Sequence, residues 1–209
     1  MLGLKRRELS RRKIDTLPAH PQCEAMNEDP LKLSTVLENG DLRLEPLTEQ
    51  HREVMREACA EDLAIWEIYA ISYGPDHFDA SFDGLLTNST RLPLAVLVDG
   101  KVAGMTCWID TDPMRKSSEI GNTYIRPKFR GGAVNGAMKH LLFAHGFACG
   151  LKRIQMTVDV RNERSQAACR KVGASFEGVI RNHMITWNGY ERDSAVFSVV
   201  ERDRERLGL

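Results

Sequence analysis

The stretch "RPKFRGGAVNGAMKHLLFAHGF", residues 126–147, places two arginines, a lysine and a pair of glycines directly before an amphipathic helical pattern. The first turn of a helix carries unpaired N–H groups and partial positive charge, so a turn of this kind suits an anionic group such as a phosphate. An ordinary connection between a strand and a helix has the same residue pattern. The sequence on either side of the stretch is needed to distinguish the two interpretations.

Apolar runs on both sides of this stretch predict strands, and helical spacing predicts the segments between them. Asp99-Gly100 joins two of the runs and indicates a hairpin, because a type I′ turn needs positive φ at both central residues. Helices are expected at residues 48–60, 61–72, 134–148 and 162–173, and residues 79–89 fit another short helix. The seven predicted strands are residues 41–47, 92–98, 101–110, 117–125, 153–160, 176–187 and 191–200.

This order predicts an α/β (α+β) fold, with a mixed, mostly antiparallel central sheet of about seven strands flanked by helices. The chain of 209 residues is long enough for one sizeable core. We therefore expect a single domain over residues 41–209. Residues 1–40 are basic at the start, contain prolines and lack periodicity, so they are expected to form a loosely ordered extension.

Charge and cysteine content narrow the class of protein. Lys plus Arg equals Asp plus Glu at 29 each, which argues against nucleic acid as a partner. No apolar run approaches the length of a membrane span. The five cysteines are scattered without a C-x-x-C pair, which indicates reduced thiols in the cytoplasm and argues against a metal site.

The turn at residues 130–133, called the glycine turn below, is a poor match to nucleotide-binding motifs. The chain has no G-x-x-x-x-G-K-[ST] run of a P-loop. Gly131, Ala133 and Gly136 form a degenerate version of the dinucleotide fingerprint, and Asp159 lies about where a ribose-binding acid would follow. The predicted antiparallel strands before the turn disagree with a doubly wound fold, so a dinucleotide-binding oxidoreductase is kept only as an alternative.

Three motifs in order resemble the GNAT superfamily of acyl-CoA-dependent N-acetyltransferases. "RGGAVN" at residues 130–135 stands where that superfamily has its R/Q-x-x-G-x-G/A pyrophosphate loop. The closer likeness is to the RimJ/RimL branch of ribosomal-protein N-terminal acetyltransferases, on "EIG" at 119–121, "NERS" at 162–165 and "GASFEGVIR" at 173–181. The resemblance covers about residues 41–200.

The resemblance implies a binding site for coenzyme A at the turn. The chain departs from the family pattern at two positions. Ala133 stands where the loop usually has its first glycine, and Asn135 stands where it has glycine or alanine. Alanine is tolerated at position 133 if its φ is negative, as a first-turn helical residue requires. The residues expected to hold the diphosphate are Arg130, Gly131, Gly132, Ala133, Val134 and Asn135.

The resemblance also implies catalytic roles. The pantetheine arm would pair with the strand before the turn, where the amide of Ile125, next to Tyr124, would polarise the thioester carbonyl. Ser165 would donate a proton to the leaving thiolate. Its alternative role is to cap the helix only. Asn162 would cap that helix, contact pantetheine, or both. Glu119 would be the base acting on the amine, with an ion pair to an arginine or an exposed position at the start of the strand as its ordinary alternatives.

Alternation along the strand is expected to place Glu119, Gly121, Thr123 and Ile125 on one face, toward a cleft. Aromatic residues at 66, 69 and 73, together with His183 and Trp187, are further candidates for the rim of that cleft. Packing is the ordinary role of such residues.

The sequence thus predicts an enzyme that transfers an acetyl group from acetyl-CoA to an amine, by direct attack in a ternary complex. The amine is a protein N-terminus or a small molecule, and no metal is expected. A non-catalytic acyl-CoA-binding domain is the second interpretation. The oligomeric state is open, with a homodimer as one possibility.

Overall fold

A computed structural model describes residue 29 and residues 31–209. The extension expected at residues 1–40 falls mostly outside these residues. Its last part belongs to the fold, since Leu33 is fully buried in the core and residues 37–39 form a strand of the sheet. The folded unit therefore includes residues before the expected boundary at residue 41.

The centre of the molecule is an eight-stranded sheet in the order β1-β2-β3-β4-β5-β6-β8-β7. All neighbouring strands are antiparallel except β5 and β6, which are parallel. The mixed, mostly antiparallel sheet is as expected, with β1 as one additional edge strand. The strands are β1 (Leu37–Asn39), β2 (Leu42–Pro46), β3 (Arg91–Val98), β4 (Lys101–Asp112), β5 (Ser117–Ile125), β6 (Arg153–Asp159), β7 (Ser175–Ile185) and β8 (Glu191–Val200).

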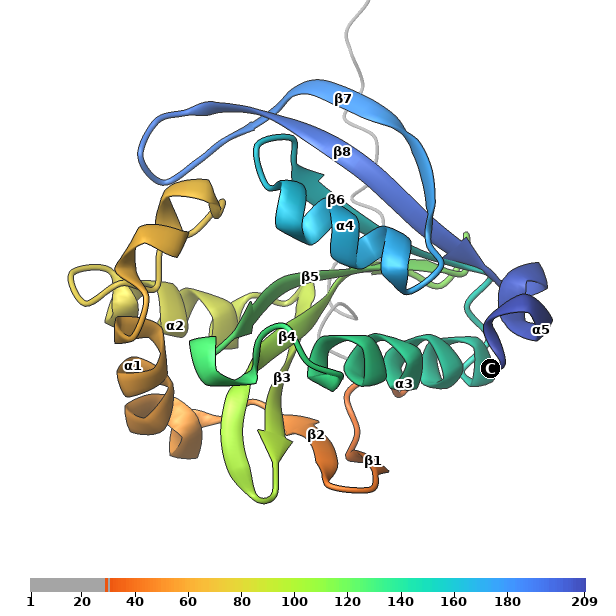
Figure 1. Cartoon of the computed structure of the whole chain (residues 1–209), viewed down its shortest axis with the longest axis horizontal. Helices are drawn as coiled ribbons and strands as arrows, with labels where there is room; N and C mark the ends of the chain where they lie inside the picture. The colour runs from red at the N-terminus through yellow and green to blue at the C-terminus, as the bar shows by residue number, and fades with distance from the viewer. Residues whose placement is uncertain (1–28, 30) are drawn as a thin grey trace, which may run out of the picture.

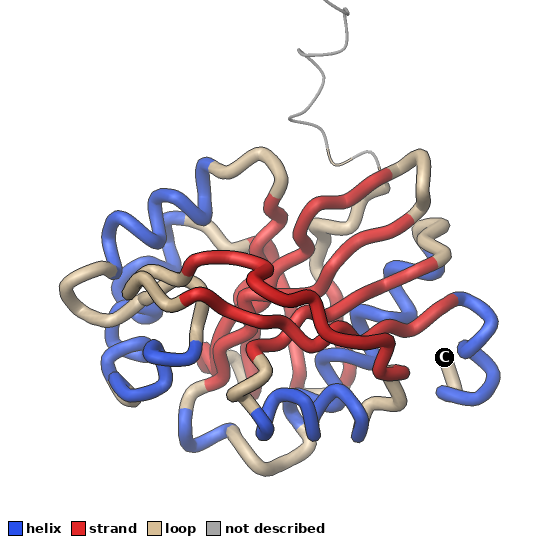
Figure 2. The backbone as a smooth tube through the Cα atoms, turned by 90° about the horizontal axis from the view of Figure 1, so that it is seen from above, coloured by secondary structure: helices blue, strands red, loops and turns tan. Residues whose placement is uncertain are grey.

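Helices cover both faces of this sheet (Figures 1 and 2). One apolar cluster joins α3 and α4 to one face, and a second joins α1 and α2 to the other. The segment expected to be helical at 61–72 contains a 3₁₀ helix over Leu63–Ile68 instead of an α-helix. The α-helices are α1 (Arg52–Ala60), α2 (Phe78–Thr87), α3 (Val134–Ala148), α4 (Glu163–Lys171) and α5 (Arg204–Leu207). None of the helices in the described part of the chain has the length and apolar character needed to span a bilayer.

The predicted hairpin turn is confirmed, since Asp99 and Gly100 have φ of 50° and 70° between the paired residues Val98 and Lys101. Positive φ at both positions is the type I′ requirement that favours Asp-Gly. This turn holds β3 and β4 in register beside β5, the strand that leads into the glycine turn.

A β-bulge in β5 contradicts the expected alternation. The pairing with β4 shifts between Met105 and Cys107, and Asn122 has a φ of 48°. An extra residue in a strand reverses which face the following side chains occupy. Glu119 and Gly121 therefore lie on the α1/α2 face, whereas Thr123 contacts α3 and the side chain of Ile125 packs in the α3/α4 cluster.

Candidate active site

Strands β5 and β6 separate at the centre of the sheet. Their register pairs are Ser117–Arg153, Ser118–Ile154 and Glu119–Gln155, and no further pair joins them in the described chain. Beyond this point β6 continues beside β8 as far as Asp159, while β5 continues beside β4 as far as Ile125. One edge of β5 is therefore left open to pair with an extended ligand.

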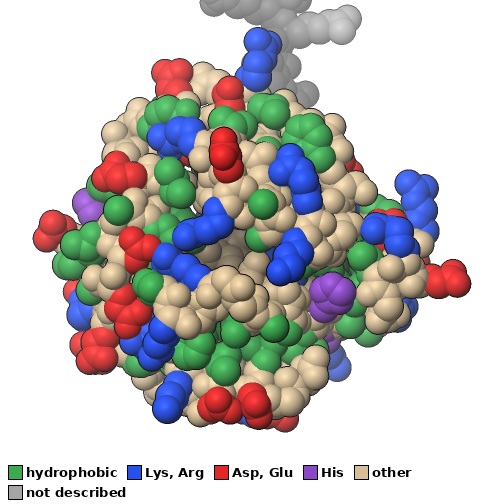
Figure 3. Space-filling view, viewed as in Figure 1, with side chains coloured by type: hydrophobic (Ala, Val, Ile, Leu, Met, Phe, Trp, Pro, Cys, Tyr) green, Lys and Arg blue, Asp and Glu red, His purple; other side chains and the backbone are tan. Residues whose placement is uncertain are grey.

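A cavity of about 1280 Å³ occupies this separation. The volume exceeds that of a site for one drug-sized ligand, so it has room for a large cosubstrate and an acceptor together. The space-filling view shows a hollow on this face with Lys and Arg side chains around it (Figure 3). Its lining includes the glycine turn, β5, β6 and the first turns of α3 and α4.

The predicted anion-binding turn lies at one end of the cavity. Gly131 has a φ of 76°, and Ala133 has a φ of −78°, the negative value that an alanine needs there. Gly132, Ala133 and Asn135 line the cavity, whereas the side chain of Val134 packs against the core. Ala133 is the N-cap of α3 and has no side-chain acceptor, so the first amides of α3 receive no cap from it.

Arg130 lines the cavity but is only partly available to a ligand. Its Nε donates to the carbonyl of Ile125 at 2.6 Å, and its Nη1 forms an ion pair with Asp62. Its Nη2 is buried and lacks a hydrogen-bond partner among the described residues. An unpaired buried N–H is costly, so the ion pair with Asp62 holds this guanidinium at the expense of one unsatisfied donor.

The backbone of Ile125 is oriented as predicted for pairing with an extended arm. The amide of Arg126 donates to the carbonyl of Ala103, so Ile125 opposite Gly104 occupies a non-hydrogen-bonded position. In such a position the N–H points away from β4, toward the edge that β6 has left. The side chain of Tyr124 lies in the opposite cluster, where its hydroxyl donates to the carbonyl of Ala58, so only its backbone is near the site.

Glu119 lies where β5 and β6 separate, and its carboxylate has two neutral donors. Thr157 Oγ1 donates to one oxygen at 2.6 Å, and Gln155 Nε2 donates to the other at 3.2 Å. No lysine or arginine of the described chain forms an ion pair with it, so the ordinary alternative of an arginine partner is not found. Gly121 beside it leaves room for this side chain, because a Cβ there would approach Glu119 Oε1 at 3.1 Å.

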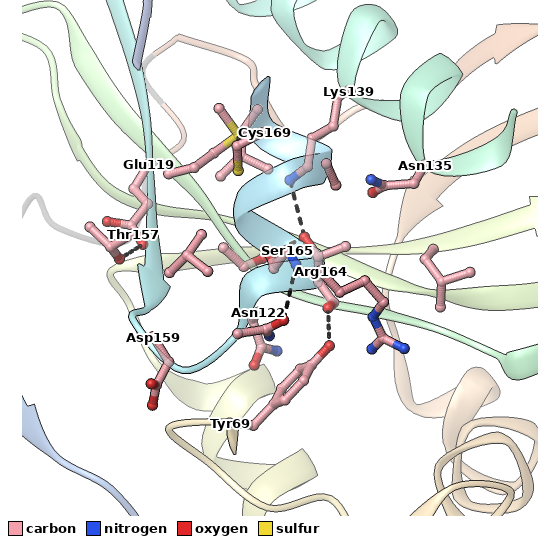
Figure 4. A pocket seen from close by; sticks show the side chains of 18 of the residues that line it. Tyr69, Glu119, Asn122, Asn135, Lys139, Thr157, Asp159, Arg164, Ser165 and Cys169 are labelled. Atoms are coloured by element: carbon pink, nitrogen blue, oxygen red, sulfur yellow. Dashed lines mark hydrogen bonds between the residues drawn. The ribbon is translucent and has the colours of Figure 1, made fainter. Parts of the chain in front are cut away.

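Asn162 and Ser165 open α4 on the other side of the cavity. Asn162 is the N-cap, and its Oδ1 accepts a hydrogen bond from the amide of Ser165 at 3.0 Å. Its predicted capping role is thereby confirmed. Both residues line the cavity, and the Ser165 hydroxyl has no hydrogen bond to another described residue, so it is free to contact a ligand. Figure 4 shows Ser165 in the cavity together with Glu119 and Lys139.

The aromatic candidates divide between packing and lining. Tyr69 lines the cavity, and its hydroxyl donates to the carbonyl of Thr123 at 2.7 Å. Burial raises the pKa of Tyr69 to about 12, so this hydroxyl keeps its proton at neutral pH. His183 also lines the cavity and contacts Ser194 Oγ at 3.0 Å. Trp187 donates from its indole to the carbonyl of Trp66, and both tryptophans are absent from the lining.

Two buried basic residues of the cavity were not predicted from the sequence. Lys139 is 7% exposed on the core side of α3, and its Nζ donates to Thr123 Oγ1 at 3.2 Å. Arg192 is also buried, and its Nη2 donates to the carbonyl of Thr157. Its Nε lies 4.0 Å from Asp159 Oδ2, an ion-pair distance, but has no hydrogen-bond partner in the described chain. Lys139 stands three and four residues before the buried Leu142 and Phe143, and this helical spacing is the signal in the sequence that places it on the buried face of α3.

The dinucleotide alternative does not fit this geometry. Asp159 accepts hydrogen bonds from the amide, Nε and Nη2 of Arg161, so its carboxylate is already engaged. Burial alone would raise the pKa of Asp159, but the hydrogen bonds from Arg161 outweigh it and the pKa is lowered. A single parallel strand pair in an antiparallel sheet is also not a doubly wound fold. Within the described residues, no three His, Cys, Asp or Glu side chains are grouped to hold a metal ion.

Comparison with known proteins agrees with the motifs. The sequence profile of the Acetyltransferase (GNAT) family matches residues 56–174, more than half of the chain. A curated relative from Bacillus subtilis (strain 168), "Putative ribosomal N-acetyltransferase YdaF", is 29% identical over 111 residues. These residues are 53% of this chain and 60% of that protein, so the match spans less than two thirds of the relative's length.

Solved structures match over a larger part of the chain. A crystal structure described as a "putative acetyltransferase" from T. thermophilus is 30% identical, with a TM-score of 0.76 over 83% of this chain and 93% of that chain. RimL, the ribosomal L7/L12 alpha-N-protein acetyltransferase in complex with coenzyme A, has a TM-score of 0.69 over 79% of this chain and 97% of its own. At 16% identity, this second structure shows a shared fold.

Proposed function

Because the chain belongs to the Acetyltransferase (GNAT) family, we propose that it transfers an acetyl group from acetyl-CoA to an amine. The observation that carries this proposal is the separation of β5 from β6, which opens one edge of β5 between an uncapped helix N-terminus and Glu119. The complex of RimL with coenzyme A supports the choice of cosubstrate for this fold.

The residues of the cavity fit coenzyme A. The amides of Gly131 through Asn135 at the start of α3 would hold its diphosphate, because they offer N–H donors with little side chain in the way. Arg130 lines the cavity at the same end and adds a positive charge near the diphosphate. The open edge of β5 up to Ile125, together with the amide side chain of Asn162, would pair with the extended arm.

Acetyl-CoA, when bound, supplies the acetyl group as a thioester. Glu119 would accept the proton that the acceptor amine loses, since its carboxylate lies in the cavity with neutral partners. The Ser165 hydroxyl would donate a proton to the sulfur from the opposite side. The amide of Ile125 would polarise the carbonyl of the acetyl group, which needs a donor aimed at its developing negative charge.

The acceptor would enter from the α1/α2 face, where Tyr69, Glu119 and His183 line the cavity. We propose a protein N-terminus or a small-molecule amine as its class, and the ribosomal N-acetyltransferase name of the Bacillus relative favours the former. The bound cosubstrate and acceptor would be present together, since the cavity has room for both.

An acetylation assay tests the proposal. The full chain is incubated with acetyl-CoA and a panel of peptides and small amines, and free thiol and acetylated product are both measured. Release of thiol that depends on an amine, with matching acetylated product by mass spectrometry, is the expected result. Tight binding of acetyl-CoA without turnover across the panel would instead favour the non-catalytic acyl-CoA-binding domain.

A further inference from the structure

Lys139 is a buried cation with few partners. Its side chain comes from α3, is 7% exposed, and lines the cavity. An ammonium group has three N–H donors, but Nζ makes one hydrogen bond within the described chain, to Thr123 Oγ1 at 3.2 Å. No carboxylate of the described residues forms an ion pair with it. Burying a charge in this state costs free energy unless a further partner is present.

The groups around Lys139 leave it charged at neutral pH. Burial lowers its pKa to about 8, while Cys169 on α4 and Glu119 on β5 act in the opposite direction. Further titratable groups from α3, α4 and the preceding turn also line the cavity: Arg130, His140, Arg164 and Lys171. Burial raises the pKa of the Cys169 thiol, so its effect on Lys139 is confined to alkaline pH, where the thiol ionises.

The partner of Lys139 on β5 lies on the expected path of the cosubstrate. Thr123 is located between Ile125, next to the glycine turn, and Glu119, where the strands separate. An arm that runs from the turn along the open edge of β5 to Glu119 therefore passes Thr123 and the ammonium beside it. Ser165 approaches the same part of the cavity from α4 (Figure 4).

We propose that Lys139 is a further catalytic residue whose ammonium stabilises the negative charge on the coenzyme A sulfur as the acetyl group leaves; this rests on the acetyl transfer proposed above. The amine nitrogen bonds to the acetyl carbon, the carbon–sulfur bond breaks, and its electron pair remains on sulfur. Ser165 gives the sulfur a proton and regains one from water, and Glu119 takes the proton that the amine loses. Lys139 keeps its protons throughout.

A structural role for Lys139 predicts a different outcome. If Lys139 served only the fold, removing its charge would unfold or loosen the protein. If its missing partner is the sulfur, replacing it by methionine, an apolar side chain of similar length, should leave the thermal midpoint of unfolding unchanged or higher, because the buried charge is gone.

The test compares Lys139→Met with Lys139→Arg, which keeps the charge, and with Lys152→Met as a matched control. Lys152 is exposed, pairs with Glu201 and lies outside the cavity lining. The pH at which the thiol of bound coenzyme A ionises is followed by thiolate absorbance in each full-length variant, with desulfo-coenzyme A as the ligand that lacks the sulfur. Thermal unfolding and kcat are measured alongside.

In Lys139→Met, the ionisation midpoint of the bound thiol should rise by about one pH unit or more, because the nearby positive charge is lost. Its kcat should fall about 10²-fold, as when one stabilising donor is removed from a reacting anion. Binding of desulfo-coenzyme A should change less than about 3-fold, since a ligand without the sulfur gains nothing from the charge. Lys139→Arg should restore the low midpoint, and Lys152→Met should match the wild type.

An unchanged midpoint in Lys139→Met would overturn the proposal, as would equal loss of coenzyme A and desulfo-coenzyme A binding or a lowered thermal midpoint without a change in ionisation. Failure of the proposed function would be recognised by a different result. If the protein does not transfer an acetyl group, the wild type itself would show no amine-dependent release of thiol from acetyl-CoA.

Discussion

Glu119 and Gln155 form the last register pair between the parallel strands β5 and β6, and the Gln155 amide donates a hydrogen bond to the Glu119 carboxylate at 3.2 Å. The only parallel pairing in the described sheet thus ends at the acid that we propose as the base. Past this pair, the open edge of β5 faces the cavity up to the turn at the start of α3.

The first prediction concerns this acid. Glu119→Gln should lower kcat by about 10²–10⁴-fold, the range typical of a lost general base, because an amide does not accept the proton of the amine. The dissociation constant of acetyl-CoA should change less than about 3-fold, since the base is not needed to hold the diphosphate. Steady-state kinetics and calorimetry measure the two quantities.

The matched control is Glu177→Gln on β7, an acid that accepts hydrogen bonds from Arg153 and Ser198 and lies outside the cavity lining. It should leave kcat unchanged. Wild-type turnover in Glu119→Gln would show that the amine loses its proton elsewhere.

The second prediction concerns the close approach of β4 to β5. A Cβ at Gly104 would lie 2.0 Å from the carbonyl oxygen of Tyr124 and 3.0 Å from the Cα of Ile125. Both atoms are backbone, so Gly104→Ala must push β5 away at the residues that border the site. We expect the free energy of unfolding to fall by about 1–3 kcal/mol or more, as for other substitutions that overpack a core.

Gly84→Ala in α2 is the control, because nothing lies within 4 Å of a Cβ there. It should stabilise the protein by about 0.5–1 kcal/mol through helix propensity. Urea unfolding of both variants checks the pair, and a stable Gly104→Ala would mean that β4 and β5 are not held as close as described.

The third prediction concerns acid stability. The pKa of Glu177 is lowered from 4.5 to about 2, mainly by its hydrogen bonds to Arg153 and also by Ser198. A carboxylate with a lowered folded pKa contributes stability above its unfolded pKa, and this contribution is lost as the pH falls through the folded value. The difference in unfolding free energy between wild type and Glu177→Gln should therefore be constant above about pH 5 and shrink toward pH 2.

The size of this difference should be below about 1 kcal/mol at neutral pH, because the Glu177 side chain is 38% exposed and solvent screens the pair. Urea unfolding at several pH values measures it. A difference that grows as the pH falls from 5 to 2 would have the wrong sign and would contradict the assignment.

Much of the fold follows from local patterns in the sequence. The seven predicted strands, the Asp99-Gly100 turn and the helix that starts at Val134 depend on residues close to one another in the chain, and the structure contains all of them. Asn162 was predicted as a helix cap for the same reason. The strand β1 was missed because Leu37–Asn39 is short and has no alternation of its own, so it forms only by pairing with β2.

The face of β5 that each residue occupies was not predictable from alternation. The bulge near Asn122 is set by the pairing with β4, which involves residues far apart in sequence, and it moves Thr123 to the side of α3. For the same reason the burial of Lys139 depends on how α3 packs over β5. The sequence motif indicated an anion-binding site at the turn, but it did not indicate that Lys139 of α3 lines the cavity.

The central claim is that the amides at the start of α3 hold the diphosphate of acetyl-CoA, and calorimetric titration of Gly132→Asp against Gly132→Asn tests it most directly. No heavy atom would lie within 4 Å of a Cβ at position 132, so both variants should fold like the wild type. Asparagine matches aspartate in size without its charge. We predict that the aspartate variant binds acetyl-CoA at least about 10-fold more weakly than the asparagine variant at low salt, and that the gap narrows as salt screens the repulsion. Equal affinity of the two variants for acetyl-CoA would contradict the claim and place the diphosphate elsewhere.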